Sequence, residues 1–283
     1  MNHLPDPHEG AVERPVPDVS IVVPTKNSVR TLRRCLESLR AQTLPCHVVV
    51  VDNHSTDTTR EVAALLSDIV FVAGPERSRQ RNLGAAATQS PVIGFVDSDM
   101  VLSPSVVEQA KSAIDAGAGS VIVPERSVGS GYWARVRAFE RAFYVDVDGI
   151  EAPRFFSARL LASTGGYDET LDAGEDWDLG RRASRAGRVE RITALIEHDE
   201  GQLTYLQACG KKGAYAAGVA RFADKNPGAL WRILLHRPYI RHPWLLLDQP
   251  RLGAGLIALK LGEAMAVVVR LLLAAATPDR PRG

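Results

Sequence analysis

The stretch Val-Ile-Gly-Phe-Val-Asp-Ser-Asp, residues 92–99, is an apolar run that ends at two carboxylates, Asp97 and Asp99, on either side of Ser98. Continuous apolar runs are typical of strands buried in a parallel sheet, and ligands of open α/β sheets bind just beyond the carboxyl ends of the strands. Two carboxylates at that place could hold Mg²⁺ or Mn²⁺, which prefer oxygen ligands and often bridge to phosphates. The alternative is a polar turn that only ends the strand.

Strand and helix patterns alternate around this stretch. The predicted strands are 19–23, 47–51, 69–72, a strand ending at Asp97, and 120–123; the predicted helices are one starting at Ser28, then 57–66, 77–88 and 104–116. This alternation predicts an α/β fold with a mostly parallel sheet covered by helices on both faces. Residues 125–200 are less regular, with helices expected at 132–144 and 175–186 and a strand at 189–196.

The composition is that of an ordinary globular protein. A formal net charge of +1 over 283 residues argues against bulk attraction to nucleic acid, so no nucleic-acid partner is expected. The three cysteines have no Cys-x-x-Cys spacing, which fits neither a disulfide framework nor a zinc site and indicates a reducing cytosol. Residues 1–18 contain no apolar core, so we expect a flexible tail at 1–17 rather than a signal peptide, and a cytoplasmic protein.

Polar residues follow several of the predicted strands. Thr25 and Asn27 come after the first strand, Asp52 after the second, and Asp97 and Asp99 after the fourth. Because the carboxyl ends of parallel strands share one edge of the sheet, these groups should converge on one crevice. A turn or cap role is an equal alternative for Asn27. Neither Gly-x-Gly-x-x-Gly nor a phosphate-binding Gly-x-x-x-x-Gly-Lys loop follows the first strand, which argues against a dinucleotide cofactor and an ATPase.

Basic residues begin the predicted helix 77–88. Arg77 and Arg81 lie one turn apart on the same face and could reach a diphosphate. A solvated basic face is the alternative for Arg77. Arg81 is the stronger candidate, because the pair Arg81-Asn82 adjoins small apolar residues that would pack on the sheet.

The stretch Gly-Glu-Asp-Trp-Asp-Leu, residues 174–179, begins another predicted helix. One face of that helix should point inward and carries Asp176, Leu179, Gly180 and Ala183. The opposite face is expected to pair in solvent and carries Asp178, Arg182 and Arg185. A carboxylate at the head of an inward apolar face is suited to general-base work, so Asp176 is the candidate base. The alternative is that Glu175 and Asp176 only cap the helix.

His198 follows the predicted strand 189–196. A lone histidine near the end of a strand is usually structural, but its imidazole could also complete a metal site.

Taken in order, these motifs resemble the family 2 inverting glycosyltransferases of the GT-A fold, over about residues 18–225. The matching segments are 23–27, 50–53 with Ser55 and Asp57, Arg81-Asn82, 97–99, 165–169 and 174–179. The resemblance implies a Rossmann-like GT-A sheet and a hexosyltransferase-like enzyme. Such enzymes move a sugar from a nucleotide-diphosphate donor, most often a UDP-sugar, to an acceptor hydroxyl in a single displacement that inverts the anomeric carbon.

The resemblance also assigns roles to residues, and it implies Mg²⁺ or Mn²⁺ as the cofactor. Asp176 matches the catalytic base. The donor would be bound by Pro24, Thr25, Asn27, Asp52, Arg81, Asp97 and Ser98, with Asp52 meeting the base of the nucleotide. The metal would be held by Asp99, His198 and Asp97. The acceptor side would include Arg159, Glu175 and Trp177.

The chain departs from the family pattern in two places. Lys26 stands where an aromatic residue is frequent, and no Gln-x-x-Arg-Trp follows the Glu-Asp element, which favours transfer of one sugar over processive synthesis. Arg154 and Arg159 fall in the expected acceptor loop; they could face an anionic or lipid-phosphate acceptor, but solvated surface is favoured. One alternative function is a nucleotidyltransferase, which would need a glycine- and basic-rich phosphate loop after the first strand; residues 25–30 of this chain are a poor substitute for it. The other is a catalytically dead nucleotide-sugar-binding protein.

Residues 226–283 are predicted to form a helical, basic and amphipathic C-terminal region. Residues 252–276 are apolar except for Lys260, Glu263 and Arg270, which fall within about 80° of one another on a helix. A helix lying in a membrane interface and a helix packed on the domain or a partner both fit, whereas a spanning helix would be costly. Aromatic and basic residues upstream favour peripheral contact through 229–276 at the cytoplasmic face of a membrane.

Overall fold

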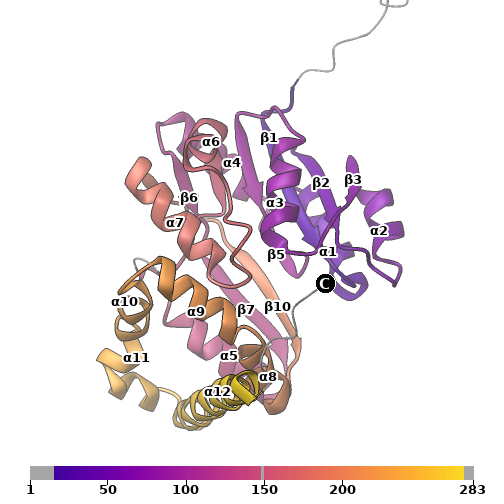
Figure 1. The fold of residues 1–283 in the computed structure, drawn as a ribbon. Coiled ribbons are helices and arrows are strands. Elements are labelled where there is room, and N and C mark those ends of the chain that lie inside the picture. Colours follow the sequence, from indigo (N-terminus) through magenta and orange to yellow (C-terminus); the bar gives the residue numbers. More distant parts are fainter. Residues whose placement is uncertain (1–15, 148–149, 277–283) are drawn as a thin grey trace, which may run out of the picture.

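The computed structural model describes residues 16–147 and 150–276. A seven-stranded sheet in the order β3-β2-β1-β4-β8-β6-β9 forms its centre (Figure 1). Its strands are β1 (Val19–Thr25), β2 (His47–Asp52), β3 (Ile69–Val72), β4 (Val92–Phe95), β6 (Ser120–Ile122), β8 (Phe155–Ser157) and β9 (Val189–Arg191). Only β8 runs antiparallel to its neighbours β4 and β6. The predicted mostly parallel α/β sheet is confirmed.

Helices cover both faces of this sheet. The flanking helices are α1 (Val29–Arg40), α2 (Thr59–Leu66), α3 (Arg77–Ala86), α4 (Val106–Asp115), α6 (Ala158–Thr164) and α7 (Glu175–Ala186). One core joins α1, α2 and α4 to one face, and a second core joins α3, α6 and α7 to the other. Successive residues of a strand point to opposite faces, so Ile21 belongs to the first core and Val22 to the second.

A second, three-stranded sheet has the order β5-β10-β7. Its strands are β5 (Met100–Leu102), β7 (Glu125–Ser130) and β10 (Ile196–Gln202). The predicted single strand 189–196 is wrong, because the chain leaves the large sheet after β9 and begins β10 in the small sheet at Ile196. Both segments carry apolar residues, and the change of sheet depends on pairing partners that are distant in sequence. Three strands were not predicted from the sequence: β7, which is mostly polar, and β5 and β8, which have three residues each.

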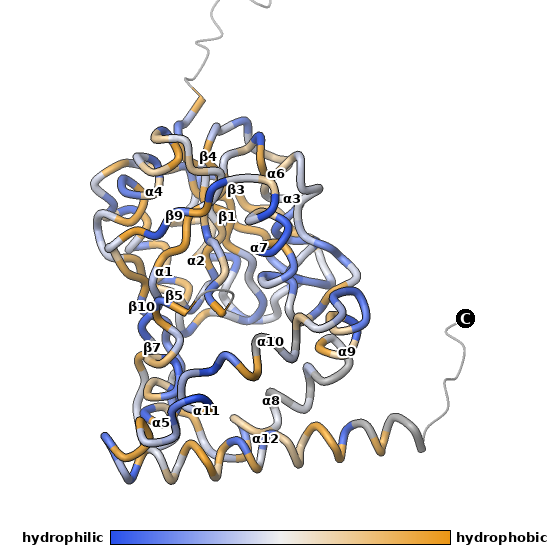
Figure 2. Tube along the Cα trace, turned by 90° about the vertical axis from the view of Figure 1, so that its left-hand side faces the viewer, coloured by the Kyte–Doolittle hydropathy of each residue, from blue (hydrophilic) through white to orange (hydrophobic). Residues whose placement is uncertain are grey.

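The remaining helices form the lower part of the molecule in Figure 1. They are α5 (Tyr132–Ala142), α8 (Tyr205–Ala214), α9 (Ala216–Lys225), α10 (Ala229–Leu235), α11 (Pro238–Arg241), a 3₁₀ helix η1 (Pro243–Leu247) and α12 (Pro250–Ala276). The long helix α12 crosses the lower end of the molecule and packs on α8 and α5 (Figure 2). A third core, which includes Val136, Cys209 and Leu259, joins these helices.

The predicted helical C-terminal region is present as far as the structure describes it. Residues 277–283, and residues 1–15 of the predicted tail, lie outside the described residues. By length and composition alone, one helix among the described residues could cross a membrane, at Pro250–Arg270, and 28% of that window is buried. All three cysteines are free and buried.

Candidate functional site

Arg81 lies at the centre of an acidic cluster formed by two distant parts of the chain. Its side chain is 0% exposed, and its guanidinium pairs with Asp97 at 2.6 Å and with Glu175 and Asp176 at 3.2 Å each. Asp97 follows β4, whereas the other two carboxylates begin α7. The two acidic motifs predicted to form one site therefore meet at Arg81.

The position of Arg81 follows from the close approach of α3 to the sheet. A Cβ atom on Gly84 would come within 2.3 Å of the Val22 side chain, so glycine is required at this contact. One turn earlier, the Gln80 amide donates to the backbone oxygens of Thr25, at 3.1 Å, and Val51, at 2.5 Å. Helix α3 is thereby fixed at the carboxyl ends of β1 and β2. Small residues do pack on the sheet beside the predicted polar pair.

A row of alternating charges continues from Asp97 toward the small sheet. Arg154 contacts Asp97 at 3.4 Å and Glu125 at 2.7 Å. Glu125 lies 3.6 Å from His198 Nδ1, and His198 Nε2 lies 3.3 Å from Asp99. The row links the acidic start of α7 to the predicted metal ligands.

The electrostatics of this row keep its inner carboxylates ionised. Burial would raise the pKa of Asp97, but the guanidinium groups of Arg81 and Arg154 outweigh burial and hold that pKa well below its usual range. Burial acts on Glu125 in the same way, and there Arg154 and His198 lower the pKa to about 2. Each acid therefore remains a counter-ion to its arginine at neutral pH.

The carboxylates that begin α7 differ in access. Glu175 is 4% exposed, and burial, together with the neighbouring charge of Asp176, raises its pKa. The side chain of Asp176 is 28% exposed and accepts a hydrogen bond from the Tyr167 hydroxyl at 3.2 Å. The N-cap of α7 is Gly174, so the two acids follow the cap position. Of the two, Asp176 has the solvent access that a general base needs in order to reach a bound ligand.

Tyr167 is a site residue that the sequence did not single out. Besides its bond to Asp176, its ring lies 4.9 Å from the Arg81 guanidinium carbon and packs edge-on against Phe95. Its only signal in the sequence is its place in the matching segment 165–169, where a lone aromatic residue cannot be told from a core residue.

Asp99 and His198 are brought together by the small sheet. In the antiparallel pairing of β10 with β5, His198 lies opposite Met100, the residue after Asp99. The predicted place of His198 after a strand is wrong, because it lies within β10. Burial would lower the pKa of His198, but hydrogen bonds to Asp99 and Glu125 raise it to about 9.

The donor set of this pair fits a divalent cation that a ligand completes. Within 16–147 and 150–276, no cluster of three or more histidine, cysteine or acidic side chains that could hold a metal is found. Asp99 and His198 nevertheless present one carboxylate and one imidazole to the same place, and Mg²⁺-type sites often take only one or two carboxylates together with phosphates and water. Both oxygens of Asp97 pair with arginines instead, so these ion pairs would have to give way before Asp97 could bind a cation.

The predicted nucleoside-binding residues also lie together. Thr25 and Asp52 are register partners in β1 and β2, and the Thr25 hydroxyl donates to Asp52 at 3.0 Å. Asp52 is 0% exposed and also accepts from the Ser55 backbone N–H at 2.8 Å. Asn27 has a positive φ of 48°, and its side-chain oxygen accepts from the Thr56 N–H at 2.9 Å. These bonds show Asn27 and Asp52 shaping the turns, and their contact with a nucleoside stays a prediction.

Two further predicted donor residues lie at the same edge. Pro24 pairs with Val51 in the β1–β2 ladder. The Ser98 hydroxyl donates to Ser28, just before α1, at 2.9 Å. Strand ends β1, β2 and β4 thus contribute to one crevice edge, as the parallel sheet predicts.

Arg154 and Arg159, which fall in the expected acceptor loop, lie in different surroundings, and their contact with an acceptor stays a prediction. Arg154 is buried, at 8% exposed, directly before β8, and its ion pairs hold the row of charges. Arg159 is exposed on α6. Arg154 is buried because β8, which it directly precedes, is inserted between β4 and β6. The favoured prediction, that both arginines lie on the solvated surface, is confirmed for Arg159 and is wrong for Arg154.

Trp177, the other acceptor candidate on α7, packs away from Arg81. Its indole N–H donates to the backbone oxygen of Ile150 at 2.9 Å, and its ring packs against Phe222 of α9. A contact with an acceptor therefore stays a prediction for Trp177, as it does for Glu175.

The opposite face of α7 is covered by protein rather than by solvent. Asp178 is 7% exposed and pairs with Arg182 at 2.7 Å, while Asn226, after α9, donates to it at 3.4 Å. The predicted pairing of these side chains in solvent is wrong for Asp178 and Arg182, because α9 and the segment at Thr164 close over them; Arg185 is exposed as predicted.

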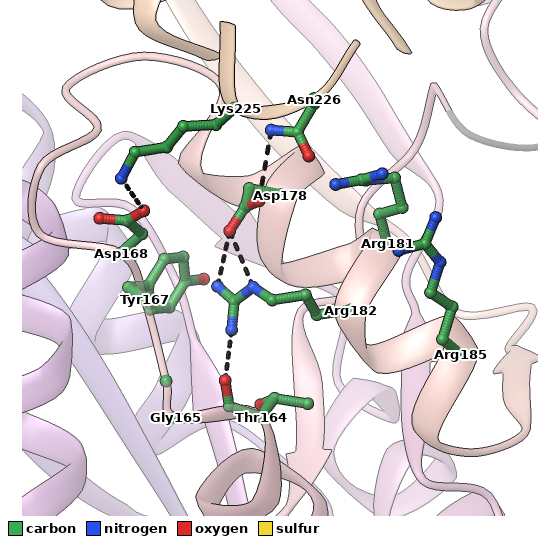
Figure 3. A pocket seen from close by; sticks show the side chains of 11 residues that line it. Thr164, Gly165, Tyr167, Asp168, Asp178, Arg181, Arg182, Arg185, Lys225 and Asn226 are labelled. Atoms are coloured by element: carbon green, nitrogen blue, oxygen red, sulfur yellow. Dashed lines mark hydrogen bonds and ion pairs between the residues drawn. The ribbon is translucent and has the colours of Figure 1, made fainter. Parts of the chain in front are cut away.

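Figure 3 shows a hollow of about 600 Å³ beside these residues. It is lined by basic side chains of α7 and by Lys225, which pairs with Asp168. It contains none of the predicted donor-binding, metal-binding or catalytic residues. Tyr167 lines the hollow and also contacts Arg81 and Asp176, so the hollow adjoins the acidic cluster at Arg81.

The architecture and this arrangement of residues have counterparts among known proteins. The sequence model of the family described as glycosyl transferase family 2 matches residues 20–164, which is just over half of the chain. The chain therefore belongs to glycosyl transferase family 2. Its sheet and flanking helices form the GT-A fold of that family's glycosyltransferases.

Two curated relatives illustrate the family. The pre-mycofactocin glycosyltransferase of Mycobacterium tuberculosis is 26% identical over 296 residues, which cover 94% of this chain and 60% of that protein. The succinoglycan biosynthesis protein ExoO of Rhizobium meliloti is 31% identical over 238 residues, which cover 66% of this chain and 68% of ExoO. The chain thus spans about 60% of the length of the first relative.

Solved structures share the fold at low identity. The structure of S. aureus TarS 1–349 in complex with UDP-GlcNAc has a TM-score of 0.55 and 17% identity, and the match covers 93% of each chain. The mannosyltransferase PcManGT from Pyrobaculum calidifontis, in complex with GDP-Man and Mn²⁺, has a TM-score of 0.55 and 19% identity, covering 94% of this chain and 77% of that one. At such identities the likeness shows the fold alone.

Proposed function

We propose that this chain is a metal-dependent inverting glycosyltransferase that moves one sugar from a nucleotide-diphosphate sugar to an acceptor hydroxyl, without processive synthesis. The observation that carries the proposal is the meeting of Asp97 and Asp176 at the buried Arg81, at 2.6 and 3.2 Å. A donor held at the β4 end would thereby lie beside a carboxylate with solvent access. Family membership and the nucleotide sugars bound by TarS and PcManGT support the same donor class.

The roles of the residues follow from their access and charge. Asp176 accepts the proton of the acceptor hydroxyl, since it is the partly exposed carboxylate of the pair that begins α7. Arg81 and the Tyr167 hydroxyl hold that carboxylate in place. Attack from the side opposite the diphosphate inverts the anomeric carbon and needs no covalent intermediate. The donor-binding edge comprises Pro24, Thr25, Asn27, Asp52 and Ser98.

Asp99 and His198 would hold Mg²⁺ or Mn²⁺. Asp97 would act on the cation site indirectly, through its ion pairs with Arg81 and Arg154. When bound, the cation would neutralise charge on the departing diphosphate. PcManGT is described with Mn²⁺, which supports a divalent metal. We propose a UDP-sugar as the donor, with GDP-mannose as the second nucleotide sugar to test, and a lipid-linked or small-molecule alcohol as the acceptor.

We keep the predicted division into a catalytic domain at 18–225 and a C-terminal region at 226–283. We also keep the predicted location in the cytoplasm, at the cytoplasmic face of a membrane.

The substitution Asp176→Asn tests the proposal, because it should affect sugar transfer without affecting donor binding. Titration calorimetry with UDP-sugars and GDP-mannose in the presence of Mn²⁺ should identify a donor. For that donor, the variant should keep the dissociation constant within about threefold, while donor hydrolysis or transfer falls by at least about 100-fold, the lower end of general-base contributions.

The exposed Asp115→Asn, on α4, is the matched control and should change neither quantity. Equal loss of binding and turnover in Asp176→Asn would make Asp176 a structural carboxylate. Wild-type protein that binds a donor and never turns it over would be a nucleotide-sugar-binding protein instead.

A further inference from the structure

Helix α12 reverses the usual arrangement of a surface helix, in which charges face water and apolar residues face the core. Glu263 is 7% exposed and pairs with Arg137 of α5 at 2.5 Å. Lys260 pairs with Glu140, also on α5, at 2.5 Å. The charged stripe that the sequence predicts on this helix therefore faces the protein as far as Glu263.

The opposite side of α12 is apolar and exposed. Its residues recur at intervals of three or four, so they form one stripe: Ile257 is 53% exposed, Leu261 68%, Met265 63%, Val268 50% and Leu272 65%. These positions fall within roughly 80° of arc on a helix, and none of them is charged. The stripe is about 22 Å long at the rise of an α-helix. We call it the outer stripe.

Neighbouring elements extend this apolar surface. Trp244 and Leu247 of η1, which packs on α12, are 60% and 71% exposed. Leu206 of α8, which also packs on α12, is 79% exposed. Figure 2 shows α12 along the end of the molecule, with α11 and α8 directly above it. Large apolar side chains exposed together along a helix and on its neighbours mark a docking site.

The charges around the outer stripe indicate its occupant. Arg241 and Arg251 are exposed, and Asp248 is the exposed acid in the same region, 241–270. Arg270 is exposed too, but it shares the helix side of Lys260 and Glu263, opposite the outer stripe. We propose that the outer stripe binds the surface of an anionic lipid bilayer, with α12 lying in the plane of the membrane. The apolar side chains would enter the acyl boundary, Trp244 would lie at headgroup level and the arginines would meet anionic headgroups.

Two other occupants fit the structure less well. A membrane-spanning α12 would have to leave the ion pairs of Glu263 and Lys260 and the buried contacts of Leu256 and Leu259, which are 1% and 0% exposed. A second copy of the chain would offer the same positive charge, at exposed Arg241 and Arg251, and so no complementary charge for this surface. A bilayer carries the complementary charge.

The experiment is flotation of the full chain with vesicles of phosphatidylcholine alone or with 30–40% phosphatidylglycerol. Wild-type protein should bind the anionic vesicles and bind the neutral ones much more weakly. Leu261→Glu combined with Met265→Glu should weaken partition at least tenfold. The matched control is Leu65→Glu, because Leu65 is 73% exposed on α2 and lies outside the outer stripe; it should bind as wild type does.

A second pair of variants tests the charge. Arg241→Gln and Arg251→Gln should each reduce binding to anionic vesicles by about fivefold and leave neutral-vesicle binding unchanged. Circular dichroism should show that all variants keep their helix content. Anionic binding by the outer-stripe variant equal to that of Leu65→Glu would overturn the proposal.

Two further outcomes would indicate a different occupant of the outer stripe. Protein that resists alkaline carbonate extraction from membranes would indicate a spanning helix, whereas extraction is expected. A dimer in solution that the outer-stripe variant dissociates, with no vesicle binding by wild type, would indicate a second copy. Neither donor nor acceptor is needed in these assays, so their failure is distinct from failure of the proposed transferase activity.

Discussion

Asp99 and His198 are almost a hundred residues apart, and a single strand pairing makes them neighbours. The register of β10 with β5 sets the 3.3 Å separation of their side chains. Either residue alone is an ordinary polar group at the edge of a strand. Their value as a cation site depends on the pair, because together they supply two protein ligands that phosphates and water would complete.

The prediction at this scale is that Asp99→Ala removes the dependence of donor binding on Mn²⁺. Wild-type protein should lose at least about tenfold in donor affinity when EDTA removes the metal, which corresponds to one charge-assisted contact. The variant should bind the donor equally weakly with and without Mn²⁺ by calorimetry. A variant that still gains affinity from Mn²⁺ would place the metal elsewhere, and Asp57→Ala, near the start of α2, is the control.

At the scale of elements, the site depends on how closely α3 and α7 approach each other and the sheet. Helix α3 brings Arg81 to the strand ends, and α7 begins with the carboxylates that meet it. The close approach of α3 is possible because Gly84 leaves no side chain against Val22.

Gly84→Ala should therefore destabilise the protein by about 1–3 kcal/mol, because the added methyl group overpacks the helix–sheet contact by more than the gain in helix propensity returns. Gly210→Ala is the matched substitution, since Gly210 of α8 has no atom within 4 Å of an added Cβ. That variant should gain about 0.5–1 kcal/mol.

Urea unfolding measures both substitutions. Equal effects in the two variants would mean that packing at Gly84 is loose. A loss of transfer activity in Gly84→Ala, at a temperature where it stays folded, would show in addition that α3 positions Arg81.

At the scale of the whole molecule, Glu140 ties the C-terminal helices to the domain. It lies on α5, is 2% exposed, and pairs with Arg137 at 2.7 Å and with Lys260 of α12 at 2.5 Å. Hydroxyl groups of Tyr144 and Tyr239 donate to the same carboxylate. One buried charge thus joins α5, α11 and α12.

This arrangement predicts loss of stability in acid. Burial would raise the pKa of Glu140, but Lys260 and Arg137 outweigh it and lower that pKa from 4.5 to about 2. Because the pKa is lower in the folded protein, the stabilisation is present above pH 4.5 and is lost as the pH falls toward 2. Its size is about 3 kcal/mol, at about 1.4 kcal/mol per pH unit.

The measurement is urea unfolding of wild type and Glu140→Gln between pH 6 and pH 2.5. The stability difference between them should be constant above pH 5 and shrink below pH 4.5. A difference that does not change with pH would mean that Glu140 stabilises through shape alone. The exposed Glu37→Gln on α1 is the control and should stay within about 0.5 kcal/mol of wild type throughout.

Several features were determined by the sequence itself. Apolar runs that end in polar residues predict both the strands of the parallel sheet and the edge at which Thr25, Asp52 and Asp97 converge. The prediction succeeds because the spacing of apolar residues along the chain indicates which residues are buried. It also succeeds because all parallel strands end at the same edge of the sheet. The motifs identify the family for the same reason, since each is a short local segment.

Only the tertiary structure decided which charges are buried and with what partners. Arg154 was expected at the surface and is buried between Asp97 and Glu125. Asp178 was expected in solvent and is covered by the segment that includes α9 and Asn226. Lys260 and Glu263 of α12 face α5. In each case an element far away in sequence covers the side chain or supplies its counter-ion. Helical periodicity tells which residues share a face, but the direction of that face depends on contacts between distant segments, so the sequence alone could not settle it.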